Sequence, residues 1–447
     1  MSDRSVVSPG LPEPGPATPL RRVALASFVG TAIEYYDFSV YGTAAALVFP
    51  RVFFPDLGHT AATVAGFAAF AVAFLSRPLG AAFFGHFGDR IGRKKTLVAT
   101  LLIMGLSTVG VGLVPSAASI GTVAPGIVIA LRLLQGFAVG GEWAGAALLG
   151  AEYAPDSKRG AYGMFTQLGV GAGTVLASVV FLIVNCTIGE KNPTFMSWGW
   201  RVPFLFSALL VWVALFVRLN MAETPVFIAE KENNEIPKIP LRELFHRQCR
   251  QVMLASGLVF ATYAFGFMTH TYLTGYAYTR LGHPRNWVLG VGILAGLVAM
   301  VTVALSASLC DTMGRRRIII FGFVCSIPWS FVVMPLLNTG SPILFAVGIV
   351  GTQALNGVFY GPLASFLPEI FATRYRYTGA GLAYNLGGIV GGAIPPIISG
   401  LLLAAFGSWS IGLMLAVLVS VSLVCAWLLP ETQGRNLAWV AEADVAS

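Results

Sequence analysis

The chain has 447 residues, of which 56% are hydrophobic and only 11% are charged. A soluble protein of this size carries about 25% charged residues, so the composition excludes a water-soluble enzyme and indicates that lipid surrounds most of the chain. The net charge of +8 comes mainly from residues in the connections between apolar runs. This placement argues against a nucleic-acid-binding protein.

Twelve apolar segments follow a Pro-rich start that is expected to be a disordered cytoplasmic tail, residues 1–22, with no cleavable signal peptide. Each is long enough to span a bilayer, which takes about 20 mainly apolar residues. The first six predicted spans are 23–48, 61–84, 97–115, 124–151, 160–185 and 201–220. The other six are 251–279, 287–310, 318–338, 342–367, 379–405 and 411–429.

The longest polar connection, 221–250, divides the spans into two sets of six. We therefore predict an N-terminal six-helix bundle over 23–220, a cytoplasmic central loop, a C-terminal bundle over 251–430 and a cytoplasmic tail over 431–447. With the N-terminus inside, most of the 28 basic residues fall on the cytoplasmic face. This bias predicts a multi-pass protein of the cytoplasmic membrane with both termini in the cytoplasm.

A charged hairpin occurs twice, at residues 85–95 and 307–317. In both copies a Gly follows an Asp by three positions, and three basic residues come directly after that Gly. The fourth and tenth spans also run into an acidic residue, Glu152 and Glu369, respectively. Matching features half a chain apart indicate a duplicated membrane protein.

The hairpin resembles the signature of the major facilitator superfamily, which is matched at Gly85, Asp89, Arg90, Gly92, Arg93 and Lys94. The second copy lacks the first Gly, at Ala307. The resemblance implies an all-α integral membrane fold with twelve transmembrane helices in two pseudo-symmetric six-helix halves.

Longer stretches resemble the metabolite:proton symporter family within that superfamily. They are residues 30–38 with 41–42, 77–80, 135–143 and 197–204. Known members carry shikimate, 2-oxoglutarate, citrate, aromatic acids, or proline and betaine. The resemblance therefore implies proton-coupled uptake and leaves the substrate open.

Six ionisable side chains lie within the predicted spans and away from their ends, and such groups at membrane depth are functional candidates. They are Glu34, Asp37, Arg77, Arg132, Glu142 and His270. Glu34 and Asp37 are three residues apart, so they share a helix face with Tyr41, and we expect this face to line a cavity. His270 fits a hydrogen-bonded structural histidine better than a functional one.

The depths of the charged residues predict their partners. We expect Arg132 to pair with a carboxylate of the first span, and Arg77 to form an intramembrane ion pair with Glu142. One of the three acids then has no permanent partner and can exchange a proton. We expect Asp37 or Glu34 to carry the proton, with Glu142 as a further candidate, while Arg132 is released to bind a substrate carboxylate. The alternative is that buried ion pairs only set helix register.

Further polar residues in the spans are candidates to bind and orient the substrate. They are Tyr41, Gln135, Gln167, Tyr263, Asn356, Tyr360, Tyr384 and Asn385. Hydrogen bonds between helices explain each of them equally well.

The hairpins invite a gating interpretation. We expect Asp89 to accept hydrogen bonds from the N-terminus of a span in the other half when the cytoplasmic side is closed, since the helix dipole favours an anion there. Arg90 and Arg93 would then hold Glu152. The full set of gating candidates is Gly85, Asp89, Arg90, Gly92, Arg93, Glu152, Asp311, Gly314, Arg315 and Glu369. Contacts of this kind bias alternating access, whereas the alternative is a topology signal that anchors the hairpin to anionic lipid.

Other chemistry finds no support in the sequence. The glycines at 169, 171 and 173 resemble a phosphate-binding loop but lie in an apolar span, where close helix packing explains them better. We find no ATP-binding loop, metal site or catalytic triad, so we expect no enzymatic activity, catalytic residue, metal or cofactor.

We therefore predict a secondary transporter for proton-coupled uptake of a small organic acid: shikimate-like, a di- or tricarboxylate, or an aromatic acid. The expected partners are the substrate, protons and the lipid bilayer, and the protein is expected to work as a monomer. The alternatives are uptake of a zwitterion such as proline or betaine, a proton-linked exporter, and a membrane sensor that does not transport.

Overall fold

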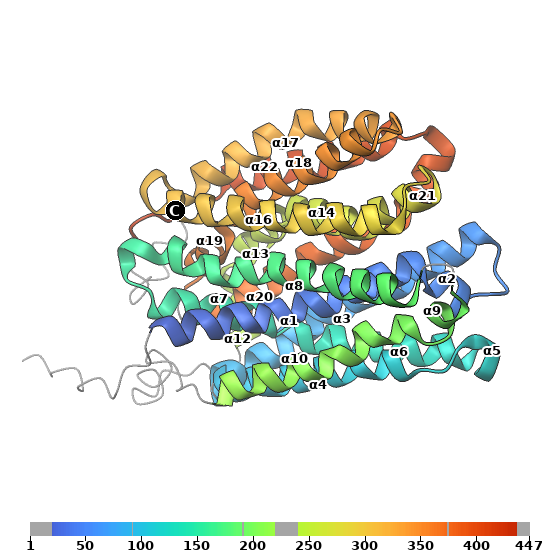
Figure 1. Cartoon of the computed structure of the whole chain (residues 1–447). Coiled ribbons are helices and arrows are strands. Elements are labelled where there is room, and N and C mark those ends of the chain that lie inside the picture. The colour runs from blue at the N-terminus through green and yellow to red at the C-terminus, as the bar shows by residue number, and fades with distance from the viewer. Residues whose placement is uncertain (1–19, 92, 190–191, 220–239, 373–374, 436–447) are drawn as a thin grey trace, which may run out of the picture.

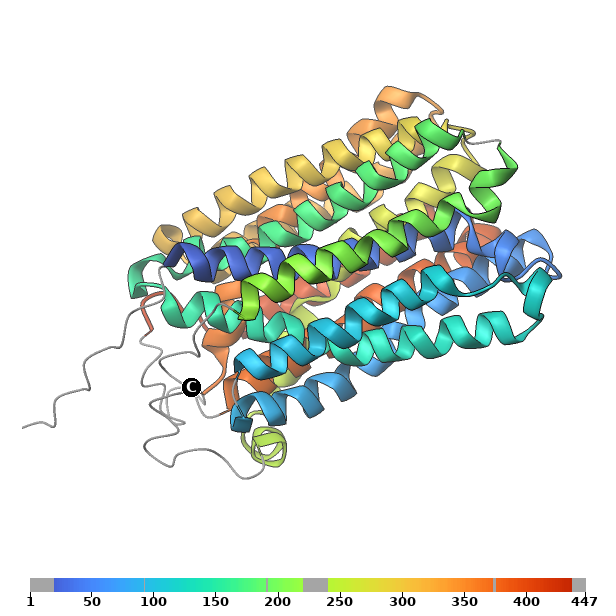
Figure 2. The same cartoon turned by 60° about the horizontal axis from the view of Figure 1, so that its bottom comes forward.

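The structure is a computed structural model that describes residues 20–91, 93–189, 192–219, 240–372 and 375–435. Every regular element in this part of the chain is a helix, and Figures 1 and 2 show the long helices running side by side along the bundle. Eleven helical segments are long and apolar enough to cross a membrane. The 28-residue helix α1 (Leu20–Leu47), which carries two carboxylates, completes the twelve spans, so the predicted all-α fold is confirmed.

Helices of the first half follow the predicted order of spans. After α1 they are α3 (His59–Ile91), α4 (Arg93–Leu113), α6 (Val123–Val139) with α7 (Glu142–Tyr153), α8 (Arg159–Ile188) and α10 (Val202–Leu219). Short elements in the connections are α2 (Phe49–Val52), α5 (Ala117–Ile120), η1 (Asp156–Lys158), α9 (Pro193–Ser197) and η2 (Gly199–Arg201).

Helices of the second half begin after α12 (Pro240–Arg247), which lies in the central connection. The seventh span is composed of α13 (Cys249–Leu258), α14 (Phe260–Phe267), the π-helix η3 (Met268–Leu273) and α15 (Thr274–Thr279). Then follow α16 (Arg285–Met313), α17 (Arg315–Asn338), α18 (Pro342–Tyr360) with α19 (Leu363–Ile370), α20 (Arg376–Gly388) with the π-helix η5 (Ile389–Ala393) and α21 (Ile394–Phe406), and α22 (Trp409–Leu428).

Spans four and ten are interrupted at the same place in the two halves. Between α6 and α7 the chain passes through Gly140 and Gly141, and between α18 and α19 through Gly361 and Pro362. Such breaks free backbone carbonyl groups, which must find partners inside the protein because lipid offers none. The matching breaks support the internal duplication.

Two pairs of helices form most of the contact between the halves: α8 with α16, and α3 with α20. Glycine allows the helices to approach closely. A side chain at Gly169 would come within 2.7 Å of the Phe28 carbonyl oxygen of α1, and Gly171 faces Met300 of α16. These contacts confirm that the glycines of span five serve packing.

The end of the bundle where α3 meets α4 and α16 meets α17 is called the hairpin end below. Gly314 joins α16 to α17 with φ 98°, a left-handed conformation that only glycine adopts readily. The expected tails at 1–22 and 431–447 and the loop 221–250 lie largely outside the described part of the chain. The predicted domain limits therefore remain predictions.

Candidate functional site

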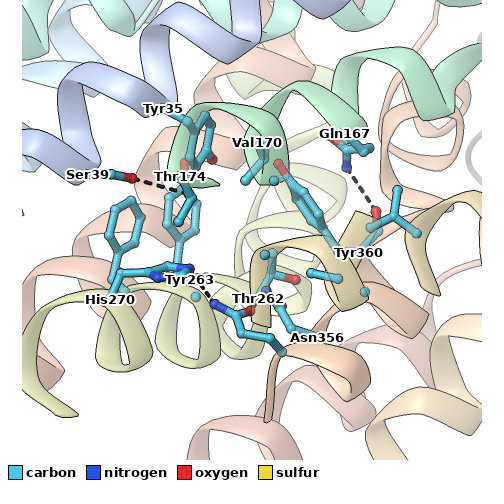
Figure 3. A pocket seen from close by; sticks show the side chains of 18 of the residues that line it. Tyr35, Ser39, Gln167, Val170, Thr174, Thr262, Tyr263, His270, Asn356 and Tyr360 are labelled. Atoms are coloured by element: carbon cyan, nitrogen blue, oxygen red, sulfur yellow. Dashed lines mark hydrogen bonds between the residues drawn. The ribbon is translucent and has the colours of Figure 1, made fainter. Parts of the chain in front are cut away.

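A cavity lies between the two halves, and its walls come from α1, α8, α14, η3, α16, α18 and α20 (Figure 3). It offers about 50 Å³ to the centres of water-sized molecules, which is room for roughly three or four waters. Its polar lining residues are Tyr35, Ser39, Gln167, Thr174, Thr262, Tyr263, His270, Thr271, Gln353, Asn356, Tyr360 and Tyr384. None of the lining residues is a Lys, Arg, Asp or Glu.

Four tyrosines from both halves form a cluster at this cavity. The Tyr384 hydroxyl lies 2.8 Å from that of Tyr35 and 3.1 Å from that of Tyr360. The Tyr263 ring lies 4.9 Å from the Tyr384 ring, and Trp143 stacks on Tyr384 at 3.8 Å between ring centroids. The cluster presents aromatic faces and hydroxyl groups to a ligand.

Amide side chains and a histidine line another part of the wall. The Gln353 amide nitrogen lies 2.5 Å from His270 Nε2, and the Asn356 amide donates to Gln353 at 3.2 Å. His270 belongs to the π-helix η3, a type of irregularity that is frequent at functional sites. The cavity thus offers several neutral hydrogen-bonding groups.

Glu34 of α1 and Arg77 of α3 form a loose buried pair beside the cavity. Both are 0% exposed, and Glu34 Oε1 lies 3.9 Å from an Arg77 guanidinium nitrogen. Within the described part of the chain, neither carboxylate oxygen of Glu34 has a hydrogen-bond partner. Arg77 donates to the Tyr263 hydroxyl at 3.2 Å and lies over the Phe38 ring at 4.1 Å. This pair therefore reaches across to the other half.

Asp37, one turn further along α1, lies in a closed network within the first half. Its carboxylate accepts hydrogen bonds from Thr108 at 2.7 Å and Ser207 at 2.6 Å. Gln135 donates to Thr108 at 2.8 Å and accepts from Arg132. We predicted that Arg132 pairs directly with a carboxylate of the first span. In the structure it connects to Asp37 only through the side chains of Gln135 and Thr108.

Glu142 pairs with Arg218, which corrects the prediction that it pairs with Arg77. Both terminal nitrogens of the Arg218 guanidinium donate to Glu142, and Thr100 donates to the same carboxylate at 2.9 Å. Arg218 lies near the end of the predicted span 201–220 and was counted among the basic residues of the cytoplasmic face. Its side chain instead turns back to the break before α7, whose first residue is Glu142.

The predicted substrate-binding residues separate into two groups. Gln167, Tyr263, Asn356, Tyr360 and Tyr384 line the cavity. The remaining four are absent from its lining: Tyr41, Arg132, Gln135 and Asn385. The first three pack within the first half, whereas Asn385 of α20 donates to the Gly140 carbonyl at 2.9 Å.

The expected cavity-facing stripe of α1 is also corrected. Glu34, Asp37 and Tyr41 turn toward α3, α4 and their neighbours, and it is Tyr35, Phe38 and Ser39 that line the cavity. Sequence reasoning also missed Gln353 and Arg218. A lone arginine in the last turn of an apolar span was the available signal for Arg218, whereas nothing local distinguished Gln353.

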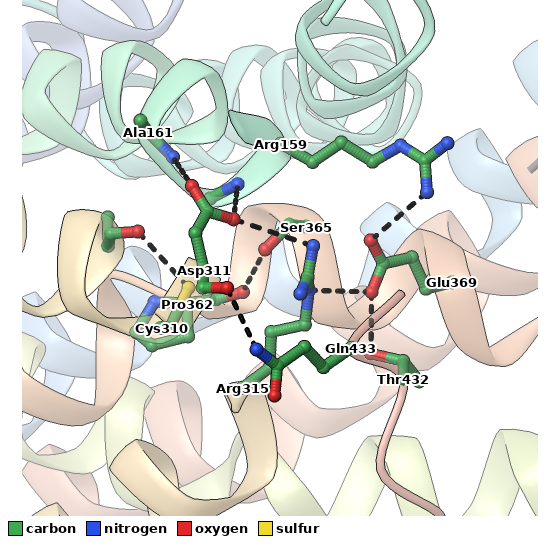
Figure 4. Close-up of polar contacts among 12 residues, drawn as sticks. Arg159, Ala161, Cys310, Asp311, Arg315, Pro362, Ser365, Glu369, Thr432 and Gln433 are labelled. Atoms are coloured by element: carbon green, nitrogen blue, oxygen red, sulfur yellow. Dashed lines mark hydrogen bonds and ion pairs between the residues drawn. The ribbon is translucent and has the colours of Figure 1, made fainter. Parts of the chain in front are cut away.

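At the hairpin end, the second half carries a compact charge network (Figure 4). Asp311 accepts from the backbone N–H groups of Gly160 at 2.8 Å and Ala161 at 3.0 Å, at the N-terminus of α8. Arg315 lies 3.6 Å from Asp311 and 2.8 Å from Glu369, and Arg159 lies 3.8 Å from Glu369. The network ties α16, α17 and α19 to a helix of the other half.

The first-half counterpart of this network lies outside the described residues. This applies to the side chains of Asp89, Arg90, Arg93 and Glu152, and to Gly92 as a whole. Gly85 is described: a side chain there would meet Thr378 of α20 at 3.1 Å, so its small size permits close contact between the halves. The gating role of both hairpins stays a prediction.

No group of three or more His, Cys, Asp and Glu side chains that could hold a metal ion occurs among the residues described by the structure. The expectation of no metal rests on the sequence alone and is not tested by this geometry.

Comparison with known proteins gives consistent matches along the chain. The family model of the Major Facilitator Superfamily matches residues 27–395. The chain is 44% identical to the inner membrane metabolite transport protein YhjE of Escherichia coli strain K12, covering 94% of this chain and 97% of the relative. It is 39% identical to the shikimate transporter of the same strain, covering 92% and 95%. It is 34% identical to that strain's proline/betaine transporter, covering 95% and 87%.

Among solved structures, the fold is similar to the proton:xylose symporter XylE bound to 6-bromo-6-deoxy-D-glucose, with a TM-score of 0.76. The match covers 94% of this chain and 98% of that chain at 18% identity. The inward open conformation of XylE from E. coli matches with a TM-score of 0.68 at 18% identity, covering 96% and 99%. At this identity the likeness concerns the fold alone.

Proposed function

The chain belongs to the Major Facilitator Superfamily, a family of membrane transporters and not of enzymes, and from this we propose that it takes up a small organic acid together with protons. The central observation is a cavity between the halves whose wall touches a buried carboxylate–arginine pair, Glu34 and Arg77. A site near the midplane between two repeats is where such folds bind substrate. The resemblance to transporters of metabolites that was noted in the sequence is confirmed.

The chemistry of the cavity supports an organic acid that also carries hydroxyl groups. Tyrosine hydroxyls and the amides of Gln167, Gln353 and Asn356 provide neutral hydrogen-bond partners, and the aromatic rings pack against an apolar ring face. A substrate carboxylate needs a cation, and two buried arginines of the first half, Arg77 and Arg132, lie against Phe38 of the cavity wall. The similarity to the shikimate transporter supports the same substrate class.

Proton coupling is assigned to the carboxylates of α1. Glu34 and Asp37 are both fully buried, and a buried carboxylate can change its protonation state when its partners change. Glu142 is a less suitable carrier because Arg218 and Thr100 hold it firmly. We assign the proton to Glu34 or Asp37.

Alternating access would open and close contacts between the halves at each end of the cavity. On the hairpin side these contacts include Asn385 and Tyr377 of α20, which donate to the carbonyls of Gly140 and Gly141. The Asp311 network adds a second set, and Asp89 would act in the same way in the first half. We assign the hairpin end to the cytoplasm because of the basic residues there, and we propose that the protein works as a monomer.

A second candidate function is uptake of a zwitterion such as proline or betaine. Four tyrosines around one cavity suit a quaternary ammonium group, which binds over aromatic faces. The similarity to the proline/betaine transporter supports this alternative. Competition between the two substrate classes separates the candidates.

The test is uptake by the purified full-length protein in liposomes with an imposed proton gradient. The labelled probes are shikimate, 2-oxoglutarate, citrate, 4-hydroxybenzoate, proline and glycine betaine, each with and without a proton uncoupler. We expect accumulation of at least one organic acid that collapses when the uncoupler is added. Accumulation that survives the uncoupler, or that is confined to proline and betaine, contradicts the proposal.

A further inference from the structure

Arg77 is buried, and several of its N–H groups have no acceptor among the described residues. Its guanidinium has five N–H groups, yet it donates to one acceptor, the Tyr263 hydroxyl at 3.2 Å. Its Nε and one terminal nitrogen have no hydrogen-bond partner among the residues that the structure describes. Because unpaired buried donors are costly, the site is suited to an incoming acceptor with two oxygens, such as a carboxylate.

Glu34 balances the charge of Arg77 without bonding it closely. The 3.9 Å separation is longer than a hydrogen bond, and both oxygens of Glu34 lack hydrogen-bond partners. The pair is therefore held by Coulomb attraction alone. An acceptor that formed two hydrogen bonds to Arg77 would compete well against this carboxylate.

Arg77 is also one side chain away from the cavity. Tyr263, which accepts its hydrogen bond, lines the cavity in the second half. Phe38, which lies 4.1 Å from the guanidinium carbon, lines it as well. A shift of the Tyr263 ring would bring the guanidinium into contact with a molecule in the cavity.

Arg132 is placed differently, although two of its nitrogens are also unpaired. Its guanidinium lies over the rings of Tyr41 at 3.9 Å, Phe38 at 4.5 Å and Phe70 at 5.1 Å, and it donates to Gln135. Of these residues Phe38 lines the cavity, whereas Gln135, which accepts the hydrogen bond of Arg132, does not. The two arginines differ in their hydrogen bonds, because Arg77 donates to a residue of the cavity wall, Tyr263, and Arg132 donates away from the cavity.

We propose that Arg77 receives the substrate carboxylate and that Glu34 is the counter-ion which this carboxylate displaces, a step that rests on the proton-coupled uptake proposed above. Glu34 takes up one proton from the outer aqueous side as it loses its partner, and no other bond is made or broken. The guanidinium keeps one negative partner, so the net charge of the site does not change. One proton enters with each carboxylate bound at Arg77, and the ligand class includes both organic acids and zwitterions.

The pH dependence of binding tests the role of Glu34. Shikimate, citrate, proline and glycine betaine are titrated into purified full-length protein in detergent by calorimetry, across a range of pH. For a probe that binds the wild type, coupling to one proton raises Kd by up to about tenfold per pH unit. Glu34→Gln should bind the same probe with a Kd that does not depend on pH. A Glu34→Gln variant that keeps the wild-type slope overturns the proposal.

The role of Arg77 is tested in a pair of double variants, so that no buried carboxylate is left without a partner. Glu34→Gln with Arg77→Gln should bind the probe at least about a hundredfold more weakly than Glu34→Gln alone, since a bidentate charged contact is lost. The matched control, Asp37→Asn with Arg132→Gln, should lose no more than about tenfold, because the hydrogen bond of Arg132 goes to Gln135, which does not line the cavity. Size-exclusion profiles verify that both proteins fold. Equal Kd values for Glu34→Gln with and without Arg77→Gln overturn the proposal.

These outcomes separate this inference from the proposed function. A probe that is accumulated by the proton gradient, but binds equally well without Arg77, overturns the assignment of Arg77 alone. A probe that is bound through Arg77, but is only equilibrated in liposomes, overturns proton-driven uptake and leaves the carboxylate site standing. Binding of none of the four probes to the wild type overturns both.

Discussion

Two carboxylates lie one turn apart on α1, and they differ in how completely they are hydrogen-bonded. Asp37 accepts hydrogen bonds from Thr108 of α4 and Ser207 of α10, which belong to its own half. Glu34 accepts none, and its partner Arg77 donates to Tyr263 of the other half.

The difference indicates a division of roles. A carboxylate with its hydrogen bonds satisfied holds the helices around it in one arrangement. A carboxylate held by charge alone breaks no hydrogen bond when its partner or its protonation state changes. In a protein whose halves move against each other, the second kind of site is suited to coupling and the first to keeping one half rigid.

The largest expected effect is on proton-driven transport, where the variants of Glu34 and Asp37 should differ. Glu34→Gln should lower proton-driven accumulation at least about tenfold, while exchange of substrate without a gradient continues. The measurement compares uptake with counterflow in liposomes. Asp37→Asn should retain the pH dependence of substrate binding that Glu34→Gln loses. Retained accumulation in both variants would reject the carboxylates of α1 as proton carriers.

Stability tests whether Arg77 and Glu34 are a true pair. Arg77→Gln alone leaves a buried carboxylate without its counter-ion and should lower the free energy of unfolding by about 3–5 kcal/mol. Adding Glu34→Gln should recover most of this loss. Thermal unfolding of the detergent-purified proteins measures both. If the double variant were no more stable than Arg77→Gln, the two side chains would not be coupled.

Removing single hydrogen bonds should affect the two sites unequally. Thr108→Val takes a donor from the Asp37 carboxylate and should cost about 1.5–3 kcal/mol of unfolding free energy. Tyr263→Phe takes the acceptor from Arg77, whose bond at 3.2 Å is longer than the 2.7 Å bond of Thr108. Its expected cost is smaller, about 0.5–1.5 kcal/mol. A larger loss for Tyr263→Phe would reverse the comparison.

The smallest expected effect concerns contacts between the halves on the hairpin side. Asn385→Ala removes the donor to the Gly140 carbonyl and should shift the balance of open and closed forms about two- to tenfold. Spin-label distances across the hairpin end measure the shift. Ser330→Ala is the control, because the Ser330 hydroxyl bonds only its own helix, at the Ser326 carbonyl. An equal shift in both variants would mean that Asn385 does not act as a latch between the halves.

The candidate site was predictable only in part. Tyr263, Tyr360 and Tyr384 were expected at the cavity and lie there, because polar residues in apolar spans turn toward the protein interior. The partners of the arginines were not predictable from depth along the helix. A long arginine side chain can reach several helices at one depth. Glu142 therefore pairs with Arg218 and not with Arg77, the partner that we predicted.

The sequence by itself determined that the chain lies in lipid, that it has twelve spans in two duplicated halves, and to which family it belongs. These features follow from apolarity, basic residues and the hairpin motif, which are local properties of the chain. Only the tertiary structure decided which face of α1 lines the cavity and which arginine lies beside it. Those outcomes depend on which helices are neighbours and how they are rotated. The break before Glu142 and the turned side chain of Arg218 are consequences of that packing.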